Sequence, residues 1–534
     1  MRWESEDNPP LSLSKTALDF KGHPAAAVEP LPSASGNGKF QNKFARWMQA
    51  GLFAVFVIFA LAEPVSPKLA VNCFRAAAFF FALCLIFGRK LQRQPLALPI
   101  LIYLSLTALS TIFSFAPAAS WGRMRTVSLI FMAIMLGQAL TSMRQVRILL
   151  AALIASTLIT VGYTAWQYTA GIGVELKSVL PGSPASQIGL RSGDIVQSVN
   201  GRKIGSPEQW RRALAASKTS LLTLDVIRST ILLTGGPIER LHVQISRQAA
   251  ALSGLDDAQN LARGRPFRAE GFFNHYVSYA GLLLLVALLV SGMLIASVGG
   301  SRIRIALLSV IFLLLLGTLA ATLTRTHLAA LLMGCLAVIW KAGMRKFFKT
   351  SLVVSLVLLL LSSVWMSQRR GIGLGLRDLG NQYRLTIWRD GLRLIREHPL
   401  LGVGLDSIAS QPERWNIQAY RRFHLISHFH SSPMQLAVEC GLPALIAWIW
   451  LVAAYWIFLV GLVNKTSSKN EKNFGWLPRG ISLGAFASLF GFLVISIVHY
   501  SMGDTEVVLV LWFIMGLSFA VERITAESLS SNPR

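Results

Sequence analysis

Charged residues are scarce in this chain of 534 residues, where Asp, Glu, Lys and Arg make up 14% and hydrophobic residues 53%. A soluble domain of this length carries more charge, and the mean hydropathy of +0.53 indicates that lipid surrounds much of the protein. Acidic residues are the scarcest, with 25 Asp and Glu against 51 Lys and Arg. No basic soluble domain accompanies the net charge of +26, so we expect anionic lipids and substrates, and no nucleic acid, as partners.

Sequence patterns for metal-dependent and proteolytic chemistry are also missing. The four cysteines do not have metal-ligand spacing, and no Asp-x-Asp pair is present to hold a metal ion against a diphosphate. The chain has no His-Glu-x-x-His, no Gly-x-Ser-Gly and no Gly-x-Gly-Asp motif. These absences argue against a protease and predict no metal site.

Long apolar runs dominate what is present. About twelve runs approach the roughly 20 residues that a helix needs to cross about 30 Å of hydrocarbon. Short loops rich in Lys and Arg alternate with short loops that carry almost none, so the positive-inside rule places both termini in the cytoplasm. The expected spans are 47–63, 69–88, 96–115, 121–140, 147–168, 272–296, 303–323, 326–342, 348–366, 433–463, 477–500 and 505–523.

The fold class expected is a mainly α-helical, polytopic membrane protein with two large external insertions. The divisions are a disordered cytoplasmic tail (1–45), the first membrane helices (46–170), an inserted β/α domain (171–248), the central membrane helices (249–366), a large helical external loop (367–432), and the last membrane helices with a tail (433–534).

The first insertion resembles the PDZ family. From Val179 to Asn200 it has a Ser-Pro-Ala turn, a Gly-Asp pair and a Val-Asn-Gly hairpin, and a helix from Ser206 to Ala216 with Pro207 at its first position matches the family's groove-lining helix. The resemblance implies a peptide or protein ligand that adds a strand to the sheet, with a gate or spacer as the alternative. The loop that would receive the peptide carboxylate is Gly171, Ile172, Gly173 and Val174.

The second insertion and the sequence around it resemble the O-antigen ligase and polymerase family. The loop has an Arg-x-x-x-Trp pattern from Arg384 to Trp388 and then Pro-Leu-Leu-Gly-Val-Gly from Pro399 to Gly404. His430 follows, nine residues before a Glu-x-Gly-Leu motif, with Ser431 where the family commonly has Asn. Upstream, the segment from Arg268 to Tyr276 and the turn Thr324-Arg325-Thr326 also match.

The resemblance implies a helical membrane glycosyltransferase of the GT-C type in the bacterial inner membrane, without metal ion or cofactor. It would move a glycan from undecaprenyl diphosphate to an acceptor hydroxyl, most simply on lipid A-core, at the periplasmic face. Such chemistry needs a base and cations that hold the leaving diphosphate. We expect His430 to be the base, and Arg384, Arg325, Arg268, Arg123 and Arg125 to hold the diphosphate by forked hydrogen bonds.

Three alternatives remain at this point. The acceptor could be a growing polysaccharide, as in an O-antigen or exopolysaccharide polymerase, or a protein, as in a protein O-oligosaccharyltransferase. About twelve helices also fit a transporter, although no matching halves with broken helices are visible. We expect His428 and His398 to form loop hydrogen bonds and Trp388 to serve only in packing.

Overall fold

The protein is described here from a computed structural model, which covers residues 35–87, 90–216, 220–228, 239–255, 257–266, 268–370, 379–423, 428–467 and 475–530. The predicted tail lies outside these residues up to position 34, and the first helix already begins within the rest of it.

All twelve predicted spans fall on helices. The fourth span is broken, because α4 gives way to a 3₁₀ turn and then to α5. Among the described residues, eight helices are long and apolar enough to cross a membrane, and α3 is apolar but only 16 residues long. The helices of the body are α1 (Ser35–Ala62), α2 (Pro67–Ile86), α3 (Ala97–Ile112), α4 (Pro117–Val127), η1 (Ser128–Ile130), α5 (Phe131–Ala139), α6 (Met143–Ala170), α10 (Tyr276–Ala296), α11 (Arg302–Ala321), α12 (Arg325–Lys341), α13 (Arg345–Arg370), α17 (Ser432–Lys465), α19 (Trp476–Val498) and α20 (Thr505–Ser530).

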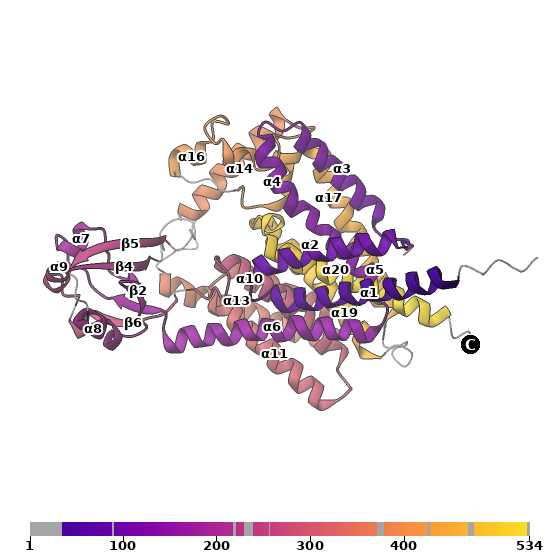
Figure 1. The fold of residues 1–534 in the computed structure, drawn as a ribbon, viewed down its shortest axis with the longest axis horizontal. Helices are drawn as coiled ribbons and strands as arrows, with labels where there is room; N and C mark the ends of the chain where they lie inside the picture. The colour runs from indigo at the N-terminus through magenta and orange to yellow at the C-terminus, as the bar shows by residue number, and fades with distance from the viewer. Residues whose placement is uncertain are drawn as a thin grey trace, which may run out of the picture.

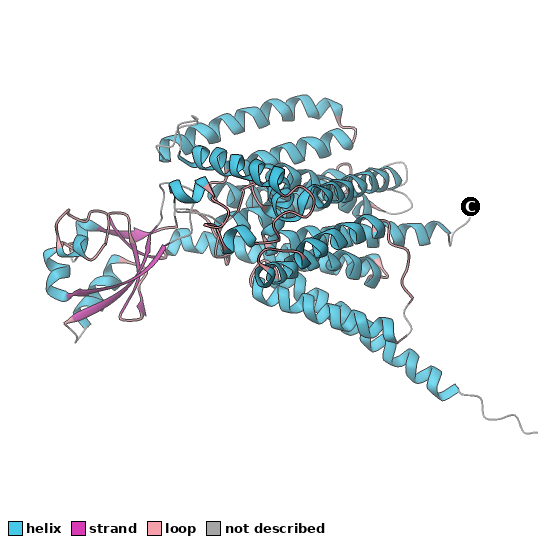
Figure 2. Ribbon diagram, turned by 90° about the horizontal axis from the view of Figure 1, so that it is seen from above, coloured by secondary structure: helices cyan, strands magenta, loops and turns pink. Residues whose placement is uncertain are grey.

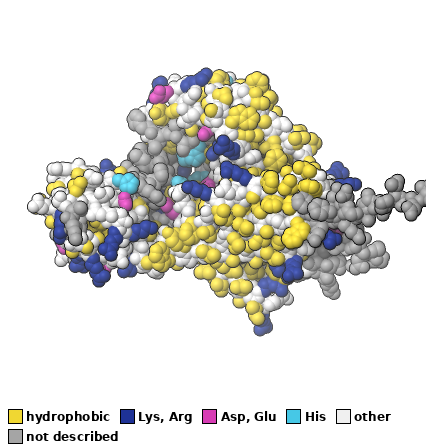
Figure 3. Space-filling model, in the orientation of Figure 1, with side chains coloured by type: hydrophobic (Ala, Val, Ile, Leu, Met, Phe, Trp, Pro, Cys, Tyr) yellow, Lys and Arg dark blue, Asp and Glu magenta, His cyan; other side chains and the backbone are white. Residues whose placement is uncertain are grey.

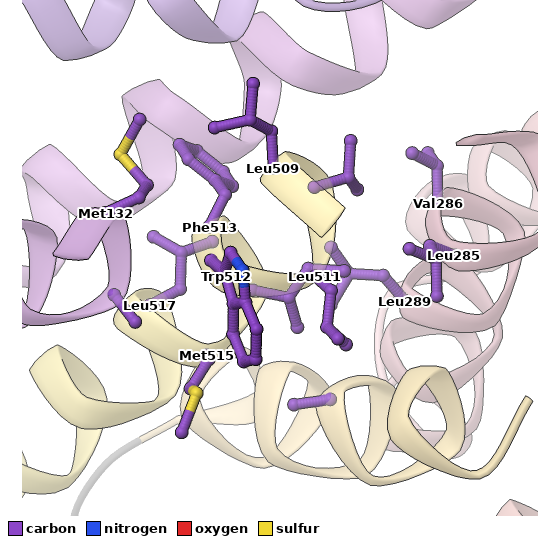
Figure 4. Packing of buried hydrophobic residues seen from close by; sticks show 14 of the residues in the cluster. Met132, Leu285, Val286, Leu289, Leu509, Leu511, Trp512, Phe513, Met515 and Leu517 are labelled. Atoms are coloured by element: carbon purple, nitrogen blue, oxygen red, sulfur yellow. The ribbon is translucent and has the colours of Figure 1, made fainter. Parts of the chain in front are cut away.

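The centre of the bundle is α10, which is apolar on all sides and almost entirely buried. It crosses α19 where two glycines meet: a Cβ on Gly292 would lie 2.1 Å from the backbone nitrogen of Gly484. Small residues at a crossing let two membrane helices pack closely. On another side Leu285 and Leu289 of α10 face α20, whose Phe513 points toward α5 (Figure 4). By contrast α11, equally apolar, is largely exposed, as a helix facing lipid would be.

The two ends of the bundle differ. Figures 1 and 2 show a small sheet domain projecting from one end, while the start of α1 and the C-terminus lie at the other. The second insertion contains α14 (Leu379–Glu397), α15 (Ser407–Ser410) and α16 (Gln418–Phe423). The helix α15 contacts α4, and α14 packs against α16 and α17 (Figure 1). These helices have their own small core around Tyr383, Ile387 and Trp415.

The sheet domain follows α6 and forms one antiparallel sheet of order β5-β4-β2-β1-β6, with β3 paired to β2. Its buried centre is Trp210, which is 0% exposed and donates its indole N–H to the Leu255 carbonyl at 2.6 Å. The elements are β1 (Gly173–Leu176), α7 (Pro184–Gln187), β2 (Ile195–Val199), β3 (Arg202–Lys203), α8 (Pro207–Ala216), β4 (Leu221–Arg228), β5 (Glu239–Ser246), α9 (Arg247–Leu252), η2 (Ala258–Asn260) and β6 (Leu261–Gly264). The domain therefore extends to Gly264, past the predicted end at residue 248.

The strand β6 also corrects the predicted peptide site. It pairs with β1 along its whole length, while the other edge of β1 pairs with β2. The amide of Ile172 donates to Gly264 O at 2.9 Å, and that of Gly171 donates to Gln167 O at 3.1 Å. In this structure the chain's own strand therefore occupies the edge of β1 beside Gly171, Ile172, Gly173 and Val174, where the peptide was expected to add.

A kink in α17 receives the external loop. Gly441 has φ 81° and ψ 172°, outside the helical region, and Pro443 has no amide hydrogen, so the carbonyl of Glu439 has no helical donor. Gly404 N and Ser110 Oγ donate to that carbonyl instead, each at 2.8 Å. The kink thus joins α17 to both the loop and α3.

The loop from Pro399 to Gly404 fits closely into this kink. Val403 N donates to the carbonyl of Val438 at 3.0 Å. Gly402 has φ 66°, and a Cβ there would lie 2.4 Å from the backbone of Glu439, so only glycine fits without displacement. The Pro-Leu-Leu-Gly-Val-Gly motif is therefore a packing element that fixes the external loop against the start of α17.

Candidate active site

His430 lies immediately before α17 in a strained backbone conformation. Its φ is +51°, in the left-handed region that most residues avoid. Both backbone groups of the preceding residue are held by side chains: Trp388 Nε1 donates to Phe429 O at 2.8 Å, and Phe429 N donates to Gln435 Oε1 at 2.7 Å. The prediction that Trp388 only packs is thus incomplete, because its indole N–H helps to hold His430 in place.

Ser431 explains why the departure from the family pattern is tolerated. It is the N-cap of α17, and its hydroxyl accepts a hydrogen bond from Met434 N at 3.5 Å. Ser and Asn are both strong N-cap residues because each offers a side-chain oxygen to the first turn. Replacing Asn with Ser therefore keeps the helix start beside His430.

The imidazole of His430 lies among other rings. Its centroid is 4.3 Å from that of His428 and 5.5 Å from that of Tyr383, and His428 is 5.8 Å from Tyr500. Burial, followed by His428, Arg384 and His275, lowers the pKa of His430 to about 3. Burial, followed by Arg123, His275 and Arg384, likewise lowers the pKa of His428 to about 4. Both imidazoles are therefore neutral at pH 7, so each has a nitrogen that can accept a proton.

Arg384 lies near these histidines, and Arg325 directly precedes Thr326, which is hydrogen-bonded to His499. Arg384 follows Tyr383 on α14, and its charge contributes to the lowered pKa values of His428 and His430. Arg325 is the first residue of α12, and its Nε and Nη2 atoms are buried with no hydrogen-bond partner among the described residues. Buried polar groups are nearly always paired, so this guanidinium is prepared for a ligand.

Arg268 and Arg123 line other parts of the region. Arg268 stacks over the Tyr276 ring at 3.9 Å, and the next residue is anchored to the end of α11 because Ala269 N donates to Ala321 O at 3.0 Å. Arg123 lies over the Tyr500 ring at 5.3 Å. Arg125 is exposed two positions further along α4, so it points to a different side of the helix. Of the two predicted arginines on α4, Arg123 is partly buried and Arg125 is exposed.

The sequence prediction missed His499 and a buried carboxyl group. His499 ends α19, and its Nε2 atom lies 2.9 Å from Thr326 Oγ1. Glu63, which follows the last residue of α1, is 0% exposed and neither carboxyl oxygen has a hydrogen-bond partner among the described residues. Burial, then Glu506 and Asp504, raises its pKa well above the ordinary value. An acidic residue directly after an apolar span was the available signal for this group.

An apolar pocket adjoins the site, with an empty volume of about 440 Å³. Histidine and basic side chains gather at a hollow between the external helices and the bundle (Figure 3). No group of three or more His, Cys, Asp or Glu side chains within the described ranges is arranged to hold a metal ion. The pocket is lined by Tyr103, Thr126, Val127, Leu405, Ser432, Leu436, Glu439, Tyr500, Met502, Val508 and Trp512.

This geometry agrees with what comparison with known families finds. Residues 310–449 match the O-antigen ligase family. The matched segment contains Arg325, Arg384, His430 and the kink of α17, which confirms the resemblance seen in the sequence. Residues 175–228 match the PDZ domain family, as predicted for the first insertion. No curated protein sequence matches the chain. The matched segment supports a ligase or polymerase type of activity on lipid-linked glycans, carried out by a multi-pass membrane protein.

Proposed function

We propose that this site transfers a preassembled glycan from undecaprenyl diphosphate to an acceptor hydroxyl at the periplasmic face of the bacterial inner membrane. The observation that carries the proposal is that a neutral, strained His430 lies near Arg384. Arg325, whose buried Nε and Nη2 atoms have no partner among the described residues, directly precedes Thr326, which is hydrogen-bonded to His499 near both of these side chains. Diphosphate oxygens are the acceptors that forked guanidinium donors fit best.

In the proposed reaction the acceptor oxygen forms a bond to the anomeric carbon as the bond from that carbon to the diphosphate oxygen breaks. His430 takes the hydroxyl proton, and Arg325 and Arg384 stabilise the charge that develops on the leaving diphosphate. With no ligand bound, burial and nearby cations oppose protonation of His430. A bound diphosphate brings negative charge, which raises the proton affinity of the imidazole. Binding of the donor therefore makes His430 a stronger base, as the reaction needs.

The remaining predicted arginines have supporting roles in this proposal. Arg268 would contact the diphosphate from the segment between the sheet domain and α10, and Arg123 would approach from α4 beside the apolar pocket. That pocket would take the first apolar units of the lipid. Arg125 is left out because it is exposed.

The orientation in the membrane is part of the proposal. Both described ends of the chain lie away from the sheet domain (Figure 1), which supports cytoplasmic termini with the sheet domain and the external helices in the periplasm. A peptide ligand of the sheet domain would have to add at β6, the edge strand of the sheet. We propose lipid A-core as the acceptor.

The test uses the full chain reconstituted in lipid vesicles with a glycan linked to undecaprenyl diphosphate. Addition of lipid A-core should give a glycosylated acceptor and free undecaprenyl diphosphate without added metal ion, in the presence of a chelator. Product formed only with a second lipid-linked glycan, or only with a protein, would assign the polymerase or the protein-glycosylating alternative. Movement of the glycan across the bilayer with no new glycosidic bond would identify a transporter and contradict the proposal.

A further inference from the structure

One residue outside the segment that matches the ligase family joins the two halves of the proposed site. His499 accepts or donates a hydrogen bond at Nε2 with Thr326 Oγ1, 2.9 Å away, and its carbonyl accepts one from Ser432 Oγ at 3.2 Å. Ser432 Oγ also accepts from Met502 N at 3.3 Å, just beyond His499 in the chain. We call Thr326, Ser432 and His499 the His499 junction.

The junction connects three elements that are distant in sequence. Thr326 directly follows Arg325 at the start of α12, and Ser432 lies two residues after His430 at the start of α17. His499 follows the last residue of α19, where its amide donates to Ile495 O at 2.8 Å. The proposed base and the proposed diphosphate-binding arginine are thus both adjacent, in sequence, to residues that contact His499.

We propose that His499 is a positioning residue that fixes Arg325 relative to His430 in the transferase. The inference rests on the proposed function. It names a residue for that function which neither the sequence patterns nor the matched family segment includes.

The need for such a contact follows from the start of α12. The residue two positions before Arg325, Leu323, has φ +55°, and the N-cap Thr324 makes no side-chain cap hydrogen bond to the first turn. The buried Nε and Nη2 atoms of Arg325 have no described partner that orients them. The bond from Thr326 to His499 therefore orients the turn from which the guanidinium projects, and transfer requires placement to within about 0.5 Å.

The surroundings of His499 suit a neutral hydrogen-bonding role. Its ring lies 5.2 Å from that of His327, whose Nδ1 atom is 3.4 Å from Thr326 Oγ1. Burial, and then His327, Arg384, His430 and His428, lowers the pKa of His499 well below its ordinary value. A neutral imidazole bonds the hydroxyl of Thr326 without adding a second positive charge that would compete with Arg325 for the diphosphate.

The experiment is a double-mutant cycle on the full chain in lipid nanodiscs. His499→Leu and Thr326→Val each remove the hydrogen bond between these two side chains. The double variant loses the same single bond. Thr326→Ser keeps the hydroxyl, and His499→Gln places an amide near the position of Nε2. The two readouts are the affinity for farnesyl diphosphate, a short-chain lipid diphosphate, and the separate kcat and donor KM of glycan transfer.

We expect each single variant to weaken farnesyl diphosphate binding about tenfold, the size of one lost hydrogen bond, with a matching rise in donor KM. The double variant should be no worse than either single variant, because both changes break the same contact. Thr326→Ser and His499→Gln should stay within about threefold of the wild type.

Additive losses, or unchanged binding in both single variants, would overturn the role of His499. Thr326→Val is nearly isosteric, so it keeps the test valid if His499→Leu fails to fold. A wild-type protein that binds farnesyl diphosphate but transfers no glycan would contradict the proposed function, while the binding cycle would still decide the junction. A wild-type protein that binds no farnesyl diphosphate would overturn both.

Discussion

The sheet domain and the candidate active site differ in how completely their polar groups are paired. In the sheet domain the buried Asp194 pairs with Arg228 at 2.8 Å. Among the residues of that domain that the structure describes, Asn200 is the one non-glycine residue with positive φ, and it lies in an Asn-Gly turn that favours this conformation. No unpartnered buried side-chain polar atom falls within the part of that domain that the structure describes. The domain is built for stability.

The site region has the opposite character. Leu323, Asp406, Asn416 and His430 all have positive φ, and Arg325 has buried donor atoms without a described partner. Strained backbone and unpaired polar groups persist in native proteins where function requires them. This difference supports the proposal that the chemistry belongs to the second insertion and the start of α17, and that the sheet domain contributes no group to the proposed reaction.

The change that should separate the two regions most strongly is His430→Ala. Loss of a general base lowers kcat by about 10²–10⁴-fold, and here farnesyl diphosphate binding should persist because Arg325 and Arg384 are unchanged. Quantified glycan product in reconstituted vesicles measures the effect. His398→Ala is the matched control: its ring packs against Phe115 and Trp415 in the same external region, and the variant should keep most activity. Full transfer by His430→Ala would remove the base assignment.

A smaller loss of transfer activity is expected for Trp388→Phe. The change keeps an aromatic ring but removes the indole donor to Phe429 O, so His430 loses one of the bonds that hold its backbone. A decrease in kcat of about tenfold, with donor KM nearly unchanged, corresponds to one such hydrogen bond. Steady-state kinetics of the purified variant give the split. An unchanged kcat would show that the strain at His430 is maintained without this bond.

Excision of the sheet domain should reduce glycan transfer even less, provided that the deletion ends where the domain ends in the structure. Ile172 N and Gly264 O are 2.9 Å apart, so the ends of residues 172–264 can be joined by a short linker. Because a shorter loop costs less entropy to close, the excision should not destabilise the bundle, and transfer should fall by less than about threefold.

A deletion of residues 171–248 is the matched comparison. It would leave β6 without β1, its partner strand, and should give less monodisperse protein in size-exclusion chromatography. Complete loss of transfer in a well-folded protein lacking 172–264 would show that the sheet domain shapes the active site, and would remove the contrast between the two regions.

The last prediction concerns stability and not transfer. The pKa of Glu63 is raised in the folded state, so the folded protein holds this proton more tightly than the unfolded chain, and the contribution to stability falls as pH rises above about 4.3. Glu63→Gln removes that loss. The free energy of unfolding of this variant should exceed that of the wild type by an amount that grows by about 1.4 kcal/mol per pH unit up to the folded pKa of Glu63. The difference should vanish below about pH 4. Thermal unfolding across this range measures it, and a constant difference would contradict the buried, protonated state.

The sequence predicted much of the fold because apolar runs and PDZ turn motifs are local signals. It failed where pairing is decided at long range. The strand β6 reads Leu-Ala-Arg-Gly and has no alternating pattern, so its pairing with β1 is visible only in the folded domain. The break between α4 and α5 could not be predicted either. The 3₁₀ turn there, Ser128–Ile130, contains no proline that would mark an interruption of the helix.

The residues of the candidate site that belong to sequence motifs were predicted, and those without a motif were not. His430, Arg384 and Arg325 belong to motifs with fixed spacing; the structure brings Arg384 near His430, and it links the turn that carries Arg325 to His499. His499 has no motif, and its position depends on the contact between the end of α19 and the start of α12. Arg125 seemed equivalent to Arg123 in sequence, but two positions along a helix turn the side chain to another side.

The most direct measurement is a cryo-electron microscopy map of the protein with undecaprenyl diphosphate bound. The account predicts density for the two phosphates within hydrogen-bonding distance of Arg325 and Arg384, next to His430, at the end of the bundle that carries the sheet domain. Diphosphate density at the opposite end, beside the termini, or out of reach of these three side chains would contradict it.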